Sequence, residues 1–167
     1  RAGETVQGAS TISQQLAREL YGLPRVWYIK PVELLLAIRL EVWMSKREIL
    51  EQYLNRVSFG NQLIGIETAA RMYFAKPAAD LAIAEAAFLA GLPQSPSQYN
   101  PYRNFSLAKK RQWLVLQRMM KNSLISIEDF NKAKQVPVAL QPYRNLFLAP
   151  HFTQMILREI GLAKLAN

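Results

Sequence analysis

Three charged residues interrupt a stretch that is otherwise almost entirely apolar. Residues 31–44 are rich in Leu, Ile, Val and Ala, and their charged members are Glu33, Arg39 and Glu41. At about 100° per residue, Lys30, Glu33 and Glu41 share one side of a helix, and Arg39 lies on the opposite side. A helix that is apolar nearly all round is expected in the centre of a domain, so a polar stripe on it is typical of a cleft wall. Alternatively, Glu33 only pairs with Lys30 one turn away, at a helix start where a carboxylate complements the helix dipole.

Two further positions carry polar groups in places where they could bind an anion. Residues 8–15 read GASTISQQ, a cluster of hydroxyls and amides that suits phosphate or sugar oxygens at a helix N-terminus, or that simply forms a capped turn. Lys46 stands in the first turn of another helix, where a cation is disfavoured, on the same face as Ile49 and Tyr53. Lys46 therefore either reaches an anion or covers apolar surface with its stem.

A loop braced by prolines holds another group of polar residues. Gln94, Ser97, Tyr99 and Asn100 all lie in PQSPSQYNP, residues 93–101. Such side chains either line a binding site or satisfy the backbone of the loop. The sequence leaves both interpretations open.

Composition excludes several kinds of chemistry. The 167 residues, of which half are hydrophobic and 20% charged, suit one domain with a core of its own. The chain has no cysteine and one histidine, His151, which excludes a disulfide framework and a zinc site built from these residues. Its longest apolar runs, 34–38 and 86–90, are much shorter than the roughly 20 residues of a membrane-spanning helix.

Charge favours an anionic partner. The net charge is +9, which suits a polyanion or an anionic membrane surface. The basic residues are spread along the chain, with one run at residues 109–111, and nothing resembles a known nucleic-acid motif. Nucleic acid is therefore a hypothesis that rests on charge alone.

The elements that position these residues are predicted to be helices. Apolar residues recur at helical spacing, and Gly and Pro cluster between the periodic segments, which indicates an all-α domain. We expect Ser10 to cap a helix over residues 11–21 that Gly22 closes, and Pro31 to stand in the first turn of a helix that ends near residue 44. Further helices are predicted over 46–54, with Ser45 and Glu48 as a capping box, and at about 65–73, 82–91, 106–122, 127–135 and 150–162.

Five segments, in order, resemble the successive motifs of family 51 peptidoglycan glycosyltransferases: GASTISQQLAREL, IKPVELLLAIRLE, SKREILEQYLNRVSFG, GIETAARMYFAKPAADLAIAEAAFLAGLPQSPSQYNP and KKRQWLVLQRM. These are the transglycosylase domains of class A penicillin-binding proteins and monofunctional transglycosylases, and LPQSPS with the later APHF looks like the penicillin-binding protein 1C branch. The resemblance implies a lysozyme-like, mostly helical fold that is truncated at its N-terminus. We expect residues 1–135 to form the core of this domain and 136–167 an extension toward a transpeptidase domain.

The resemblance implies roles for the residues at matching positions. Glu33 is the expected catalytic residue that assists the departing diphosphate, and Lys30 contacts that diphosphate. Because Ile29 replaces the Arg of the motif, Arg18 or Arg25 is expected to compensate. A divalent metal, Mg²⁺ or Mn²⁺, is expected at the donor diphosphate, with no metal held by the protein alone. The full set of expected substrate-binding residues is Ser10, Thr11, Gln14, Gln15, Lys30, Lys46 and Ser97, while Glu51, Tyr53, Asn55, Arg111, Val115 and Leu116 match motifs that support the cleft.

The implied activity is the polymerisation of lipid II by inverting transfer from an undecaprenyl diphosphate donor to the 4-hydroxyl of N-acetylglucosamine. The implied partners are lipid II, the nascent glycan strand, the membrane surface and other cell-wall synthesis proteins, with no nucleic acid. The implied location is the outer face of the bacterial cytoplasmic membrane. The alternative is a non-catalytic basic helical module that binds anionic lipid or a cell-wall partner.

Two more expectations concern the general base and the membrane. The resemblance implies a base in an E-D-x-x-F-x-x-H motif, which this sequence does not contain, so we expect the chain to be inactive alone. Because a polyprenyl donor stays in the bilayer, we also expect the apolar and aromatic segment 21–28, which includes Trp27 and Tyr28, to contact the membrane surface. Alternatively, these two rings are core residues.

Overall fold

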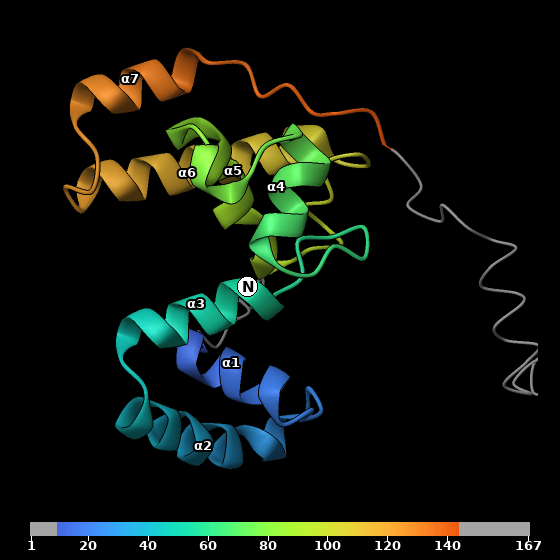
Figure 1. Cartoon of the computed structure of the whole chain (residues 1–167), viewed down its shortest axis with the longest axis vertical. Helices are drawn as coiled ribbons and strands as arrows, with labels where there is room; N and C mark the ends of the chain where they lie inside the picture. Colours follow the sequence, from blue (N-terminus) through green and yellow to red (C-terminus); the bar gives the residue numbers. More distant parts are fainter. Residues whose placement is uncertain (1–9, 144–167) are drawn as a thin grey trace, which may run out of the picture.

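The computed structural model describes residues 10–143, whose regular structure is helical apart from one isolated antiparallel bridge between Ser58 and Ile64. Figure 1 shows the helices in chain order. The α-helices are α1 (Ile12–Leu20), α2 (Lys30–Trp43), α3 (Lys46–Arg56), α4 (Ile66–Phe74), α5 (Ile83–Gly91), α6 (Phe105–Lys121) and α7 (Ile127–Gln135). The short 3-10 helices are η1 (Trp27–Ile29), η2 (Ala78–Asp80) and η3 (Leu92–Gln94). The predicted all-α class is confirmed.

The predicted helices agree closely with the described ones. Helices α4 to α7 begin and end within one residue of the predicted bounds. The helix predicted at 150–162, and His151 with it, lie outside the described residues. Within the described part, none of the helices combines the length and apolar character that crossing a membrane requires.

The start of α1 corrects one predicted cap. Thr11, not Ser10, is the N-cap: its hydroxyl accepts from the Gln14 backbone N–H at 3.2 Å, and the Gln14 side chain accepts from the Thr11 N–H at 2.9 Å. A reciprocal box needs the partner three residues ahead of Gln14, and this leaves the Ser10 side chain free for another contact. Gly22 follows α1 with φ +60°, as predicted for a glycine that closes a helix.

The predicted starts of α2 and α3 are confirmed. Pro31 stands in the first turn of α2, where its missing N–H costs no hydrogen bond. Ser45 caps α3, and its N–H donates to Glu48 Oε2 at 2.7 Å while Ser45 Oγ accepts from the Glu48 N–H at 3.2 Å. Because α2 ends at Trp43 and α3 begins at Lys46, the two helices are joined by a tight corner.

The helices pack in two groups along the long axis of the molecule. Figure 1 shows α1, α2 and α3 at the lower end and α4 to α7 at the upper end. The lower group encloses a small core that includes Leu16 and Ile49. The upper group encloses a larger core with Tyr73 and Phe88 at 0% exposure, and a smaller apolar cluster packs α7 against α5 and α6.

A loop at residues 57–65 joins the two groups and is fixed to the upper one. The Tyr73 hydroxyl donates to the Phe59 carbonyl at 2.9 Å, and burial raises the pKa of Tyr73 to about 12. The amides of Asn61 and Asn100 bond each other at 2.6 and 3.2 Å. A Cβ on Gly60, which has φ +85°, would lie 2.9 Å from a carbonyl oxygen of the 95–101 loop, so this contact requires glycine.

The outward side of α2 corrects the expectation that this helix is buried all round. Its buried residues Glu33, Ala37 and Leu40 form one face, which packs mainly on α1. The opposite face is apolar but exposed, with Val42 and Trp43 76% and 80% accessible. We call this surface the outer face of α2; its members are Val32, Leu34, Leu35, Ile38, Val42 and Trp43.

The segment between α1 and α2 also faces outward. Trp27 is 84% exposed, and its ring meets that of the exposed Tyr28 edge to face, with the centroids 6.1 Å apart. The alternative that these two rings are core residues is therefore wrong.

Candidate active site

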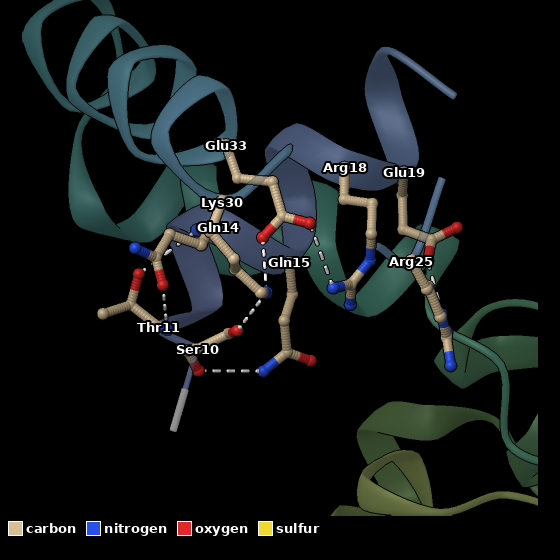
Figure 2. A network of polar contacts seen from close by, with 9 residues as sticks. All are labelled: Ser10, Thr11, Gln14, Gln15, Arg18, Glu19, Arg25, Lys30 and Glu33. Atoms are coloured by element: carbon tan, nitrogen blue, oxygen red, sulfur yellow. Dashed lines mark hydrogen bonds and ion pairs between the residues drawn. The ribbon is translucent and has the colours of Figure 1, made fainter. Parts of the chain in front are cut away.

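A buried carboxylate held by two cations forms the centre of the site. Glu33 lies in the first turn of α2 with 1% of its side chain exposed. Its Oε2 accepts from Lys30 Nζ at 2.6 Å, and its Oε1 accepts from Arg18 Nη1 of α1 at 3.4 Å, as Figure 2 shows. The Lys30 to Glu33 pair at the helix start is therefore real. The burial of Glu33 and the second cation go beyond what that simple pairing predicted.

The entrance to α1 closes over the same cluster. Lys30 Nζ also donates to Ser10 Oγ at 2.9 Å, and Gln15 Nε2 donates to the Ser10 carbonyl at 3.2 Å. Figure 2 places Thr11 and Gln14, the capping pair, beside these residues. The structure therefore brings residues 10–15 of the GASTISQQ segment next to the Lys30 to Glu33 turn, which is about 20 residues further along the chain.

The cluster carries more positive than negative charge. Lys30 and Arg18 together contribute two positive charges against the single carboxylate of Glu33. Lys30 is half-exposed, and Arg18 Nε is buried without a hydrogen-bond partner among the described residues. A cluster with one surplus cation, an accessible ammonium and adjacent hydroxyl and amide groups can bind an anion.

The two candidates for the missing motif Arg lie in different places. Arg18 contacts Glu33 directly, whereas Arg25 is exposed and its Nη2 lies 3.8 Å from Glu19 Oε1. Figure 2 shows this second pair apart from the Glu33 cluster. Of the two, Arg18 is therefore the better candidate to replace the Arg that the motif has at position 29.

Lys46 takes part in a separate chain of contacts that links three helices. Its Nζ lies 2.7 Å from Glu41 Oε2, and Glu41 Oε1 accepts from Ser13 Oγ at 2.5 Å. The hydrogen bond from Lys46, followed by that from Ser13, holds the pKa of Glu41 below its ordinary value. Lys46 thus reaches an anion of the protein itself, and its contact with substrate stays a prediction.

Ser97 does not join the cluster. It is exposed in the loop after η3, which packs against residues 57–65 through Gly60 and Asn61. In the same loop, Asn100 Oδ1 accepts from the Tyr102 N–H at 3.0 Å, which favours the interpretation that these polar residues satisfy the loop. Binding of substrate by Ser97 stays a prediction without a contact that supports it.

A metal held by the protein does not fit this site. Both oxygens of Glu33 already accept from cations, and within the described residues no three His, Cys, Asp or Glu side chains gather to hold an ion. Divalent cations of the magnesium class prefer several oxygen ligands, which this cluster does not offer. The metal expected at the donor diphosphate stays a prediction, and no step below depends on it.

The match to a family model described as Transglycosylase covers residues 1–120, and the chain belongs to that family. The all-α fold and the cationic cluster around Glu33 are consistent with a transglycosylase domain. The division of the chain at residue 135 stays a prediction.

Individual relatives match nearly the whole chain. Penicillin-binding protein 2D of Bacillus subtilis is 43% identical over 164 residues, which cover 96% of this chain and 24% of the relative. Penicillin-binding protein 1A of Escherichia coli is 36% identical, over 95% of this chain and 19% of the relative. The crystal structure of penicillin-binding protein 1A from Haemophilus influenzae matches with a TM-score of 0.60 at 29% identity, over 89% of this chain and 20% of that chain. The chain thus spans less than a quarter of these proteins, and the expected likeness to the 1C branch stays a prediction.

Proposed function

We propose that this domain is a peptidoglycan glycosyltransferase of the class A penicillin-binding type, which extends glycan strands from lipid II. The observation that carries the proposal is the buried Glu33 between Lys30 and Arg18, next to the polar N-terminus of α1, in a chain of the transglycosylase family. A donor sugar on a polyprenyl diphosphate presents two phosphates in a row. A surplus of cations beside hydroxyl and amide groups suits that chemistry.

The cations are proposed to act on the leaving group. As the acceptor hydroxyl bonds to the anomeric carbon of the donor, the bond from that carbon to the diphosphate oxygen breaks, and negative charge grows on the diphosphate. Lys30 Nζ and the Arg18 guanidinium are fixed before the reaction by Glu33 and Ser10. Hydrogen-bond donors that are already held in place stabilise such developing charge without reorganising during the step.

Glu33 is proposed to position the two cations rather than to take the acceptor's proton. Both of its oxygens accept hydrogen bonds from cations, an arrangement that suits a carboxylate whose task is to hold Lys30 and Arg18 in place. Glycosyl transfer therefore needs a second carboxylate as general base. The resemblance assigns that task to the E-D-x-x-F-x-x-H motif, outside this cluster.

The apolar surface of the lower helix group supports work at a membrane. A polyprenyl chain removed from lipid would expose apolar area at about 0.8 kcal/mol per methylene, so the site must come to the bilayer. The exposed Trp27 and Tyr28 and the outer face of α2 give the domain an apolar and aromatic contact surface. We propose that this surface meets the outer leaflet of the bacterial cytoplasmic membrane.

Donor binding tests the proposal without requiring turnover. Lipid II in detergent micelles is titrated into the 167-residue chain by calorimetry, for the wild type and for Lys30→Ala, Arg18→Ala and Arg25→Ala. Loss of a hydrogen bond to a charged group should weaken binding about tenfold or more for the first two variants. The exposed Arg25 should lower affinity by less than about threefold.

Two outcomes would contradict the assignment of the donor site. Equal losses in all three variants would mean that binding depends on overall charge, and unchanged affinity in Lys30→Ala would place the diphosphate elsewhere. Because Arg18→Ala leaves Glu33 buried with one cation, Arg18→Lys serves as a variant that keeps the charge, and circular dichroism reports folding. A chain that folds but binds no lipid II would favour the non-catalytic alternative.

A further inference from the structure

A shallow cleft lies on the lower helix group, away from the Glu33 cluster. Its volume is about 280 Å³, and its lining consists of Tyr21 at the end of α1 and Arg39, Leu40, Trp43 and Met44 of α2. No residue of the Glu33 cluster takes part in it. The cleft combines one positive charge with largely apolar walls, so its ligand should combine the opposite charge with apolar groups.

The charge in the cleft is free to meet an outside anion. Arg39 is exposed, and none of the ion pairs among the described residues includes it. The acids of α1 and α2 have other partners: Glu19 pairs with Arg25, Glu33 with Lys30, and Glu41 is bonded by Lys46 and Ser13. A planar guanidinium without a carboxylate partner can donate two parallel hydrogen bonds to two oxygens of a phosphate.

The surroundings of Arg39 distinguish a lipid from a small soluble anion. Tyr21 and Trp43 are exposed rings with one polar end each, the kind of side chain that lies at the headgroup level of membranes. Beside them runs the outer face of α2, where Leu35, Ile38 and Val42 are all more than half exposed. A free phosphate would leave this apolar surface in water, whereas a phospholipid covers it with acyl chain while its phosphate meets Arg39.

We propose that this cleft binds the phosphate of an anionic phospholipid. Arg39 contacts the phosphate oxygens, Tyr21 and Trp43 flank the headgroup, and the outer face of α2 lies against the acyl chains. The proposal rests on the proposed function only in placing the domain at a bilayer. The lipid it names is distinct from the glycosyl donor, whose diphosphate is assigned to Lys30 and Arg18.

Flotation of the 167-residue chain with vesicles tests the site. Vesicles contain phosphatidylcholine alone or equal parts of phosphatidylcholine and phosphatidylglycerol. We expect the wild type to bind the anionic vesicles preferentially, and Arg39→Gln to lose about fivefold or more in affinity, because one cation at the surface contributes roughly that much. Arg39→Lys keeps the charge but cannot form two parallel hydrogen bonds to a phosphate, so its affinity should lie between those of the wild type and Arg39→Gln.

Arg118→Gln is the matched control, because it removes the same charge from an exposed position. Arg118 lies on α6, in the helix group at the other end of the molecule (Figure 1), and its loss should change affinity by less than about twofold. Equal losses of vesicle affinity in Arg39→Gln and Arg118→Gln would overturn the site, because binding would then depend on overall charge. A larger loss in Arg118→Gln would overturn it by placing the lipid contact on α6.

A second arm separates a lipid phosphate from a free one. Inorganic phosphate is added to the bound vesicles at the ionic strength of a sodium chloride control, and we expect the two salts to release the protein equally. Stronger release by phosphate would show a site for the free anion and overturn the lipid assignment. A wild type that binds lipid II in detergent but no anionic vesicles would also overturn it, while leaving the proposed donor site intact.

Discussion

Glu33 shows how much one side chain depends on its partners at the residue scale. The Lys30 to Glu33 pair alone would be an ordinary ion pair at a helix start. Here, however, the Glu33 side chain is 1% exposed, and Arg18 contacts it from another helix. The charges of Lys30 and Arg18 thereby acquire a fixed geometry. Sequence spacing predicted the Lys30 contact because the two residues are one turn apart, whereas Arg18 and Glu33 are 15 positions apart in the chain and no local pattern signals their contact.

Ser10 and Thr11 are adjacent hydroxyl residues with different contacts, which predicts different consequences for their removal. Thr11→Ala removes the N-cap of α1 and should lower the free energy of unfolding by about 1 kcal/mol, because Thr11 Oγ1 bonds the Gln14 N–H. Ser10→Ala leaves the capping box intact and should change stability by less than about 0.5 kcal/mol. Urea denaturation followed by circular dichroism measures both variants.

The same pair separates stability from binding. Because Ser10 Oγ accepts from Lys30 Nζ, Ser10→Ala should weaken the binding of lipid II although it leaves the fold unchanged. If Ser10→Ala instead destabilised the chain as much as Thr11→Ala, the assignment of the cap to Thr11 would be wrong.

At the scale of elements, caps and turns account for where the helices begin and end, and these were predictable. Ser45 with Glu48, Pro31 and Gly22 each mark a boundary through chemistry within a few residues. The cap of α1 was missed by one residue because Ser10 and Thr11 are both good N-caps, and the choice depends on which lies three residues before Gln14.

The exposed side of α2 could not be predicted in this way. Its apolar composition indicated burial, but hydrophobicity alone does not tell whether neighbouring helices cover every face. In the structure, α1 covers one side of α2, while Leu35, Val42 and Trp43 on the outer face remain exposed. Which face of α2 stays uncovered depends on how α1 and α3 pack against it, and local sequence does not encode that packing.

Two capping carboxylates predict how the stability of these elements changes with pH. The backbone N–H of Ser45 lowers the pKa of Glu48 and the backbone N–H of Ala78 lowers that of Glu67, each from an ordinary value of 4.5. A carboxyl whose pKa is lower in the folded state contributes stability that is fully present above its unfolded pKa and is lost as the pH falls through the folded value. We expect the free energy of unfolding to decrease when the pH falls below about 4.5.

Thermal unfolding across a pH series measures this effect. Glu48→Gln should reduce the loss of stability on acidification, because the variant has no carboxyl to protonate at that cap. Glu51→Gln, which removes the same charge from the same helix but away from the cap, serves as the matched control. Stability that rises on acidification, or a Glu48→Gln slope identical to that of the wild type, would be inconsistent with the role given to this cap.

At the scale of the whole molecule, basic residues are spread along the chain, but the net positive charge is concentrated in one part of it because acids are few there. Residues 103–135 carry eight Lys or Arg against two Asp or Glu, so they account for six of the nine net positive charges. The ion pairs among the described residues all lie between positions 18 and 85. The lower helix group, in contrast, combines the Glu33 cluster, with its one surplus cation, and the apolar outer face of α2, which suits the proposed contacts with donor and membrane.

The polymerisation rate of Glu33→Gln tests the central claim most directly. The measurement uses this domain with an E-D-x-x-F-x-x-H segment joined upstream, since the 167-residue chain is itself expected not to polymerise lipid II. Gln keeps the shape of Glu33 but removes the charge that fixes Lys30 and Arg18, and loss of such electrostatic support should lower the rate about 10²-fold or more. With folding verified by circular dichroism, a fall of that size supports the account, and turnover near that of the wild type would contradict it.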